Sequence, residues 1–430
     1  MLYIQNMSIG HKIRYLRKKK QMKQEDLSRG ICSVSYLSKI ENEILQPSQE
    51  TIYLLFSRLG YIEETDELTE VQGMLRKWNI HLMKREEKEA LELFSFFDKK
   101  DFANESIQLE YRVFRIQYYL QRNKIGPVKS ELTELIEQVI DMPLKTRLYF
   151  YKHSAYYYYH VGNLEEASKQ IQEAQKFIPF LEMSTLELAD FYYAFSLVNS
   201  KNNDTKTAVA YAEKALSCYQ KIYMLRKCVD CHIILGICHK RNFQYESAFE
   251  QYDSALSLAR EINYEDMLPP IKHNLSSLYS ILGQHDRALS LLRELYDDLS
   301  EYHSYTSARI VLSLIKEYCK AGQLKKASDC LEKVYSGVLH TPALSELKTE
   351  YMFFYLMLNE EFDELDRKME RSMIPELMNQ NKYLTLSNFC DYMGEYFEKQ
   401  SKYKRSSSYY KLAKELVVKS LQKNQGVEGL

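Results

Sequence analysis

The chain has 430 residues, 45% of them hydrophobic and 27% charged, which is enough for two or three domains and a sizeable core. Its 13 glycines and 8 prolines make up about 5% of the residues where ~12% is usual, so an almost wholly helical protein is expected. The eight cysteines are scattered through apolar helical patterns, which argues against a disulfide framework. No apolar run is long enough for a membrane span and no signal peptide is recognisable, so we expect a cytoplasmic protein without membrane contact.

The formal net charge is only −1, but the charge is unevenly distributed. Residues 1–60 hold 10 Lys and Arg against 5 Asp and Glu, whereas the rest of the chain holds 48 against 54. A basic head on a mildly acidic body indicates that only the head meets nucleic acid.

The first predicted elements have the layout of a helix-turn-helix. A helix over 9–19 is followed by a short helix with Leu27 inward, a turn at Gly30, and a helix that buries Leu37 and Ile40. Small and polar residues occupy the outer side of that last helix, a pattern that fits the major groove: Ser33, Ser35, Tyr36, Lys39 and Asn42. We expect these residues to reach bases and phosphates, with three further phosphate contacts: Gln24 at a helix N-terminus and the basic Lys18 and Lys19.

Many spaced residues of this head follow one family pattern, among them Leu16-Arg17, Leu27-Ser28, 35–42 and Pro47-Ser48. Together they resemble the Cro/repressor (Xre-type) DNA-binding domain, which implies the DNA-facing roles given above for Gln24, Ser33, Ser35, Tyr36 and Lys39. The alternative is a helical domain used only for protein contacts. The basic surplus on the expected outer faces favours DNA.

A connecting helix is predicted over 67–97. Its apolar stripe has heptad spacing over little more than two heptads: Leu68, Val71, Leu75, Trp78 and Leu82. The stripe either packs on the adjoining domain or forms a subunit contact. Because domains of this type commonly read pseudo-palindromes in pairs, we expect a homodimer.

Residues 98–424 repeat themselves. Five alanines recur at intervals of 41, 40, 40 and 39 residues: Ala167, Ala208, Ala248, Ala288 and Ala327. The residue twelve positions before each alanine is small in most of the repeats, and residues typical of a turn lie between the two positions. This pattern resembles the tetratricopeptide repeat, lengthened from its usual 34 residues. It predicts roughly eight antiparallel helix pairs wound into a right-handed solenoid, a last helix over 405–422 and a disordered tail over 425–430.

The first helix of each pair is expected to line the concave face. Counting from the repeated alanines puts eleven residues there: Lys152, Tyr156, Tyr159, Asp190, Tyr193, Asp230, His273, Asn274, Ser277, Arg309 and Lys316. Amide side chains can satisfy the backbone of an extended peptide, and aromatic walls can take its apolar side chains. Each residue taken singly has an ordinary solvated or packed position as its alternative, so the prediction applies to the set.

An Xre-type head (1–66), a linker helix (67–97) and a tetratricopeptide-like body (98–424) together look like the RNPP family of bacterial peptide-pheromone receptors, particularly its PlcR- and NprR-like members. The resemblance implies an all-α transcriptional regulator that binds operator DNA and a short signalling peptide. The residues His273-Asn274-Leu275 are similar to the family's asparagine-bearing groove helix, and only Asn274 is carried across. The alternative is a repeat scaffold that modulates another signalling protein, such as a phosphotransfer component.

One stretch resembles a haem-attachment or zinc-binding motif, and we do not assign it either role. Cys228, Cys231 and His232 spell a haem-attachment string, but attachment of that kind needs export. Zinc would need ligands that converge tetrahedrally, whereas these residues lie on one predicted helix. With no phosphate loop, nucleophile elbow or paired carboxylates in the sequence, we expect neither a metal, nor a cofactor, nor enzymatic activity.

Overall fold

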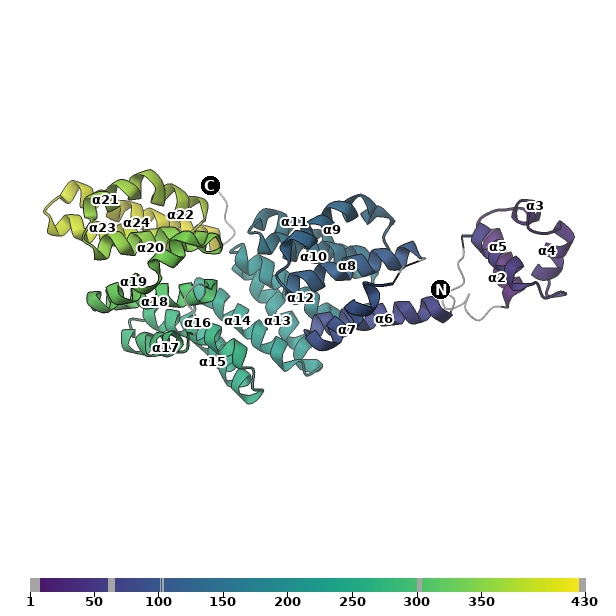
Figure 1. Cartoon of the computed structure of the whole chain (residues 1–430), viewed down its shortest axis with the longest axis horizontal. Coiled ribbons are helices and arrows are strands. Elements are labelled where there is room, and N and C mark those ends of the chain that lie inside the picture. The colour runs from purple at the N-terminus through teal and green to yellow at the C-terminus, as the bar shows by residue number, and fades with distance from the viewer. Residues whose placement is uncertain (1–7, 61–65, 101, 103, 300–303, 425–430) are drawn as a thin grey trace. The chain divides into compact units, whose positions relative to one another are not determined.

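The computed structural model describes residues 8–60, 66–100, 102, 104–299 and 304–424, and these form helices joined by turns (Figure 1). They divide into two compact units: residues 1–81 with 91–98, and residues 82–90 with 99–430. The tail expected over 425–430 lies outside the described residues.

The first unit contains the head and most of the connecting segment. Its helices are α2 (Ile9–Lys19), α3 (Gln24–Ser28), α4 (Val34–Glu41), α5 (Gln49–Arg58), α6 (Asp66–Lys84) and α7 (Glu87–Phe97), of which α6 and α7 each extend into the second unit. The core of the head consists of apolar residues from its four helices and from the turn after α5: Ile13, Leu27, Leu37, Ile40, Ile52, Leu55, Phe56 and Leu59. Ile13, Leu27 and Leu37 are completely buried, as the helical spacing of the sequence predicts.

The connecting segment is two helices rather than the single predicted helix over 67–97. Arg85 takes a left-handed backbone conformation, with φ of 58°, and this ends α6. The buried Trp78 packs on Phe94 and Phe97 of α7, with ring centroids 6.3 and 5.7 Å apart. Arginine, unlike glycine or asparagine, does not mark a left-handed turn in a sequence, so the stripe of apolar residues concealed the break.

The second unit is a series of helix pairs. Eight pairs follow one another in the described residues: α8 (Glu105–Gln121) with α9 (Ile125–Leu135), α10 (Leu144–His160) with α11 (Leu164–Gln175), α12 (Thr185–Lys201) with α13 (Thr205–Lys221), α14 (Leu225–Arg241) with α15 (Tyr245–Glu261), α16 (Leu268–Ile281) with α17 (His285–Asp297), α18 (Tyr305–Lys320) with α19 (Leu324–His340), α20 (Ser345–Leu358) with α21 (Phe362–Lys368) and α22 (Ile374–Asn379), and α23 (Tyr383–Lys399) with α24 (Tyr403–Asn424). Short 3₁₀ segments join some pairs (Ile136–Asp141, Ile178–Phe180, Glu265–Met267 and Pro342–Leu344). A π-helical turn over Met369–Met373 lies between α21 and α22.

Small residues allow the two helices of a pair to approach closely. The five repeated alanines all lie on the second helix of a pair and are completely buried. Gly236 of α14 faces the buried ring of Tyr252 so closely that a Cβ there would stand 2.5 Å from a ring carbon. Gly394 of α23 has the same relation to Tyr410 of α24, at 2.7 Å. The fixed register of small residues therefore sets the helix spacing within the pairs.

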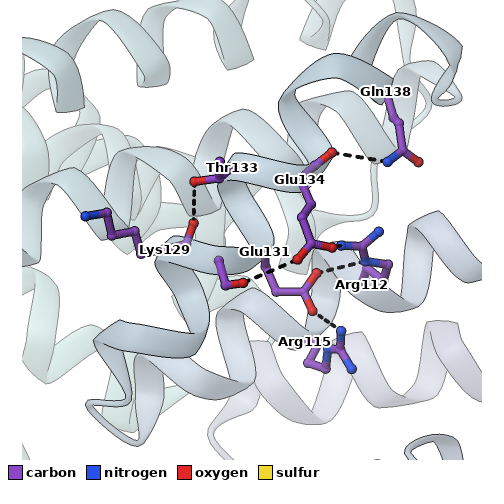
Figure 2. A network of polar contacts seen from close by, with 8 residues as sticks. Arg112, Arg115, Lys129, Glu131, Thr133, Glu134 and Gln138 are labelled. Carbon is purple, nitrogen blue, oxygen red and sulfur yellow. Dashed lines mark hydrogen bonds and ion pairs between the residues drawn. The ribbon is translucent and has the colours of Figure 1, made fainter.

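The first pair is held differently, by charged side chains. Glu131 of α9 is buried, accepts a 2.9 Å hydrogen bond from Arg112 Nε and is also bound by Arg115 (Figure 2). Arg112 reaches Glu134 as well, at 2.6 Å. Val128 stands completely buried where later pairs have alanine. A larger residue at the contact and the ionic network of Glu131 distinguish this pair from the alanine-containing pairs that follow.

Candidate functional site

The outer face of α4 is the candidate DNA-binding surface. Four of the five residues predicted for it are exposed, Ser33, Ser35, Lys39 and Asn42, while Tyr36 is half-buried and packs on the head's core. Ser33 caps the helix, because its hydroxyl accepts a 3.1 Å hydrogen bond from the backbone N–H of Tyr36.

Two contacts fix the position of α4 within the head. Gly10 of α2 lies against the carbonyl of Ile40, and a Cβ at Gly10 would stand 2.1 Å from that oxygen. Arg14 donates a 3.2 Å hydrogen bond to the side-chain oxygen of Asn42 at the end of α4. The two helices are therefore close enough that only glycine fits at the crossing.

The side chain of Gln24, for which a phosphate contact is predicted, contacts a neighbouring helix of the head. Its side-chain amide donates a 2.8 Å hydrogen bond to the carboxylate of Glu41, which is buried. Arg17 binds the same carboxylate through two nitrogens, at 2.6 and 2.7 Å. The hydrogen bond to Glu41 and the charge of Glu41 raise the pKa of Arg17 in spite of its burial. In this structure Gln24 ties α3 to α4, whereas Lys18 and Lys19 are exposed at the end of α2.

The candidate peptide-binding surface lies on the first helices of the pairs. All eleven residues predicted for it are on α10, α12, α14, α16 or α18, and consecutive helices of this set contact one another. A first cavity, of about 450 Å³, brings together four of them: Tyr156, Tyr159, Asp190 and Tyr193. A second, of about 550 Å³, has Ser277 and Lys316 in its wall. The structure thus gathers six of the eleven around two hollows.

The other five predicted residues do not line these two hollows. Lys152 is buried and its ammonium group binds Asp190, so it acts as an internal counter-ion. Asp230 is also buried and lies 3.9 Å from Arg85 in the turn after α6. Arg309 is exposed on α18.

His273 and Asn274 are neighbours on α16 with different surroundings. The imidazole Nε2 of His273 is 2.8 Å from the hydroxyl of Ser313. Burial, together with repulsion from Arg309, Lys240 and Lys316, lowers the pKa of His273 to about 3, so this ring is neutral at physiological pH. The half-buried amide of Asn274 has no hydrogen-bond partner among the described residues. It is the kind of group that a peptide backbone can satisfy.

Sequence reasoning missed several charged residues of these hollows, including Arg85, Lys227, Lys240, Arg241 and Lys320. A signal for some of them was present, since Ser200, Lys240, Ser280 and Lys320 recur at intervals of 40 residues. Arg85 had none, because its position depends on the break between α6 and α7.

The thiols of α14 serve the packing of the array. Cys228, Cys231 and Cys238 are buried, and burial raises the pKa of each. Among the described residues, no group of three His, Cys, Asp or Glu side chains is placed to hold a metal ion. In the same part of the chain, no helix combines the length and apolarity that crossing a bilayer requires.

Comparison with known proteins identifies the family. A helix-turn-helix family model (HTH_3) matches residues 13–65. The transcriptional activator NprA of Geobacillus stearothermophilus is 31% identical over 403 residues, which cover 89% of this chain and 97% of NprA. The chain belongs to the RNPP family of bacterial regulators.

More distant proteins are also similar to this chain. Response regulator aspartate phosphatase I of Bacillus subtilis is 21% identical and covers 71% of this chain and 78% of its own length. The apo form of the quorum sensor NprR from B. thuringiensis superimposes with a TM-score of 0.67 at 15% identity, over 82% of this chain and 100% of its own. NprR in complex with its cognate peptide NprX gives 0.65 at 16% identity, over 81% and 99%. The predicted all-α class, with a helix-turn-helix head and tetratricopeptide-like pairs, is confirmed.

Proposed function

We propose that this RNPP protein is a transcriptional regulator that binds operator DNA through α4 and a short signalling peptide on the inner face of its repeats. The inner face is the surface formed by the first helices of the pairs. The observation that carries the proposal is the relation to the activator NprA along almost the whole chain. The exposed polar face of α4 supports the DNA-binding half, and the partnerless amide of Asn274 supports the peptide-binding half. NprR, which shares the fold, has been solved with a cognate peptide. Acting on DNA would place the protein in the cytoplasm.

The proposed DNA contacts are Ser33, Ser35, Tyr36, Lys39 and Asn42, with Gln24, Lys18 and Lys19 on phosphates. Selection of bound sequences from a random double-stranded library with the full chain would give the operator. A Lys39→Ala variant should select a relaxed sequence at one position, with a discrimination loss of about 1–3 kcal/mol. Failure of the wild type to select any sequence would contradict DNA reading by the head.

Peptide binding, and the contact proposed for Asn274, are tested with peptides encoded by a small open reading frame that has an export signal and lies beside the gene. A cognate peptide at about 100 times its Kd should stabilise the full chain by about 2.7 kcal/mol, measured by thermal unfolding. Asn274→Ala should weaken this stabilisation, while Asn379→Ala, at an exposed position on α22, should leave it unchanged. Equal loss in both variants would argue against a specific role for Asn274.

We also propose a homodimer on DNA and no enzymatic activity. Two copies would match a pseudo-palindromic operator, and the mass of the DNA complex measured in solution tests this. The similarity to response regulator aspartate phosphatase I makes a protein partner the second candidate function. Capture of a response regulator in stoichiometric amount, with no stabilisation by any peptide, would favour that candidate over the first.

A further inference from the structure

The cavity of about 550 Å³ on the inner face is lined by four cationic side chains. Lys240 and Arg241 come from the end of α14, and Lys316 and Lys320 come from α18. Hydroxyl groups stand among them, from Ser276, Ser277, Ser280 and Ser313. Ammonium, guanidinium and hydroxyl groups together are donors that suit an anion.

Carboxylates in and near the cavity balance only part of this charge. Glu317, also in its wall, is buried, lies 2.6 Å from His285 Nδ1 and is 3.9 Å from Lys320. Lys316 has its own partner in Glu350, at 2.5 Å. The ammonium of Lys240 donates to the hydroxyl of Ser277 at 3.2 Å and forms no ion pair among the described residues.

The arrangement around Lys240 contrasts with that of other lysines on the same face. Lys152 is buried and has Asp190 as its counter-ion, and Lys316 has Glu350. In both, a charge on one first helix meets a carboxylate on the next first helix along the array. At Lys240 the neighbouring first helix, α16, offers a serine instead. Within the described part of the chain, Lys240 therefore lacks a carboxylate counter-ion of the kind that Lys152 and Lys316 have.

The pKa values of two side chains are lowered by the surrounding positive charges and by burial. Burial and repulsion from Arg241 and Arg309 lower the pKa of Lys240 to about 8. His273, one turn before Ser277, has its pKa lowered by burial and by Arg309 and Lys240 among others. An anion beside Lys240 would offset this repulsion and keep the lysine protonated.

We propose that the cavity around Lys240 is a subsite for a carboxylate of the bound peptide. The inference rests on the proposed function, because it assigns a chemical group to the ligand of the inner face. The carboxylate comes from the peptide's C-terminus or from an Asp or Glu side chain. The ammonium of Lys240 pairs with it, and the serine hydroxyls of α16 and α18 donate to its remaining lone pairs.

The test uses synthetic pools of short peptides that are randomised, without Asp or Glu, at every position but one. That position is Glu in one pool and Gln in its match, and each pool is made with a free C-terminal carboxylate and with a C-terminal amide. The pools are passed over the immobilised full chain, and retained peptides are quantified by mass spectrometry. The wild type should retain a carboxylate-bearing pool about 10- to 100-fold better than its neutral match. A preference in the Glu–Gln comparison identifies a side chain as the source, and one in the acid–amide comparison identifies the C-terminus.

Variants then test whether the preference for carboxylate-bearing peptides depends on Lys240. Lys240→Met should abolish it while peptides are still retained, and Lys240→Arg should keep it. Lys221→Met, at an exposed position at the end of α13, should behave as the wild type. Circular dichroism verifies the helix content of each variant, and the wild-type comparison stands whether or not a variant folds.

The outcomes separate this inference from the function on which it rests. Retention of peptides without any carboxylate preference overturns the subsite and leaves peptide binding intact. Stabilisation of the wild type by inorganic phosphate, again without carboxylate preference, assigns the cavity to free phosphate and also overturns it. Retention of no peptide in any pool contradicts the proposed function, and the subsite with it.

Discussion

Glu41 is the residue around which the three helices of the DNA-binding motif are held. Its carboxylate lies at 2% side-chain exposure and binds the half-buried Arg17 from α2 and Gln24 from α3. A buried charge with two partners from separate helices determines how α4 is presented. The apolar core supplies most of the stability, whereas this network specifies the orientation.

Replacing Glu41 by Gln should loosen the head. The loss of charge leaves the guanidinium of Arg17 without its counter-ion in a partly buried place, and we expect a cost of about 3 kcal/mol. Hydrogen exchange of α2–α4, measured by mass spectrometry on the full chain, should become faster by a factor that corresponds to this cost. Glu43→Gln is the control, since Glu43 is 42% exposed beside His11 and its loss should cost below about 0.5 kcal/mol. Equal acceleration in both variants would contradict a special role for Glu41.

Lys18 and Lys19 give a second prediction at this scale. Both are exposed in the last turn of α2 and are proposed to neutralise phosphates. Each alanine substitution should weaken binding to all DNA sequences to a similar degree. The slope of log K against log salt should fall in magnitude by about 1 for each lysine removed. Binding isotherms at several salt concentrations measure this, and a slope that stays the same would remove the lysine from the interface.

At the scale of the elements, the approach of the two helices in a pair depends on single small residues. Gly236→Ala would place a methyl group against the completely buried ring of Tyr252, and we expect a destabilisation of about 1–3 kcal/mol. Gly126 on α9 is the matched control, because a Cβ there has nothing within 4 Å. Alanine at Gly126 should be neutral or stabilising by up to about 1 kcal/mol. Urea unfolding followed by circular dichroism distinguishes the two, and equal effects would show that the contact at Tyr252 does not matter.

The pairing of the helices could be predicted because its determinants are local. A buried alanine and the small residue twelve positions earlier recur at a nearly constant interval, and periodicity is visible without knowledge of any contact. The break at Arg85 and the contact of Gln24 with Glu41 could not be predicted in the same way. Each depends on a partner far along the chain, Asp230 for Arg85 and Glu41 for Gln24, or on a backbone conformation that leaves no mark in the residue type.

Ion pairs between neighbouring first helices make the array sensitive to acid. Burial raises the pKa of Glu350, but attraction to Lys316 and Lys382 and hydrogen bonds to both outweigh burial and lower it to about 2, from an ordinary value of 4.5. The folded state therefore binds this proton less tightly than the unfolded chain does. The stabilisation is fully present above pH 4.5 and is lost as the pH falls toward 2, by an amount on the order of 2 kcal/mol.

Hydrogen exchange of α18 and α20 between pH 7 and pH 3 measures this loss. In a Glu350→Gln variant the two helices should be less protected at pH 7, and their protection should depend less on pH. Glu332, exposed on α19, provides the control: Glu332→Gln should retain the acid sensitivity of the wild type. If Glu350→Gln retained it too, other carboxylates would be responsible for the acid response.

At the scale of the whole molecule, the proposed function requires that two ligands on different units influence one another's affinity. Any such influence is a coupling free energy, typically ~1–3 kcal/mol, equivalent to a 5- to 150-fold change in affinity. The coupling is reciprocal by thermodynamic necessity. If a peptide on the inner face changes the Kd for operator DNA by some factor, the operator must change the Kd for the peptide by the same factor.

This reciprocity predicts the outcome of two titrations of the full chain. In one, operator DNA is titrated with and without saturating peptide; in the other, peptide is titrated with and without saturating operator, in the same buffer because the DNA term depends on salt. The two ratios of Kd should agree. Asn274→Ala should weaken peptide binding and Lys39→Ala should weaken operator binding, yet each variant should preserve the equality, since it follows from linkage rather than from either contact. A peptide that stabilises the protein but leaves the operator Kd unchanged would show that the inner face binds peptide without gating the head.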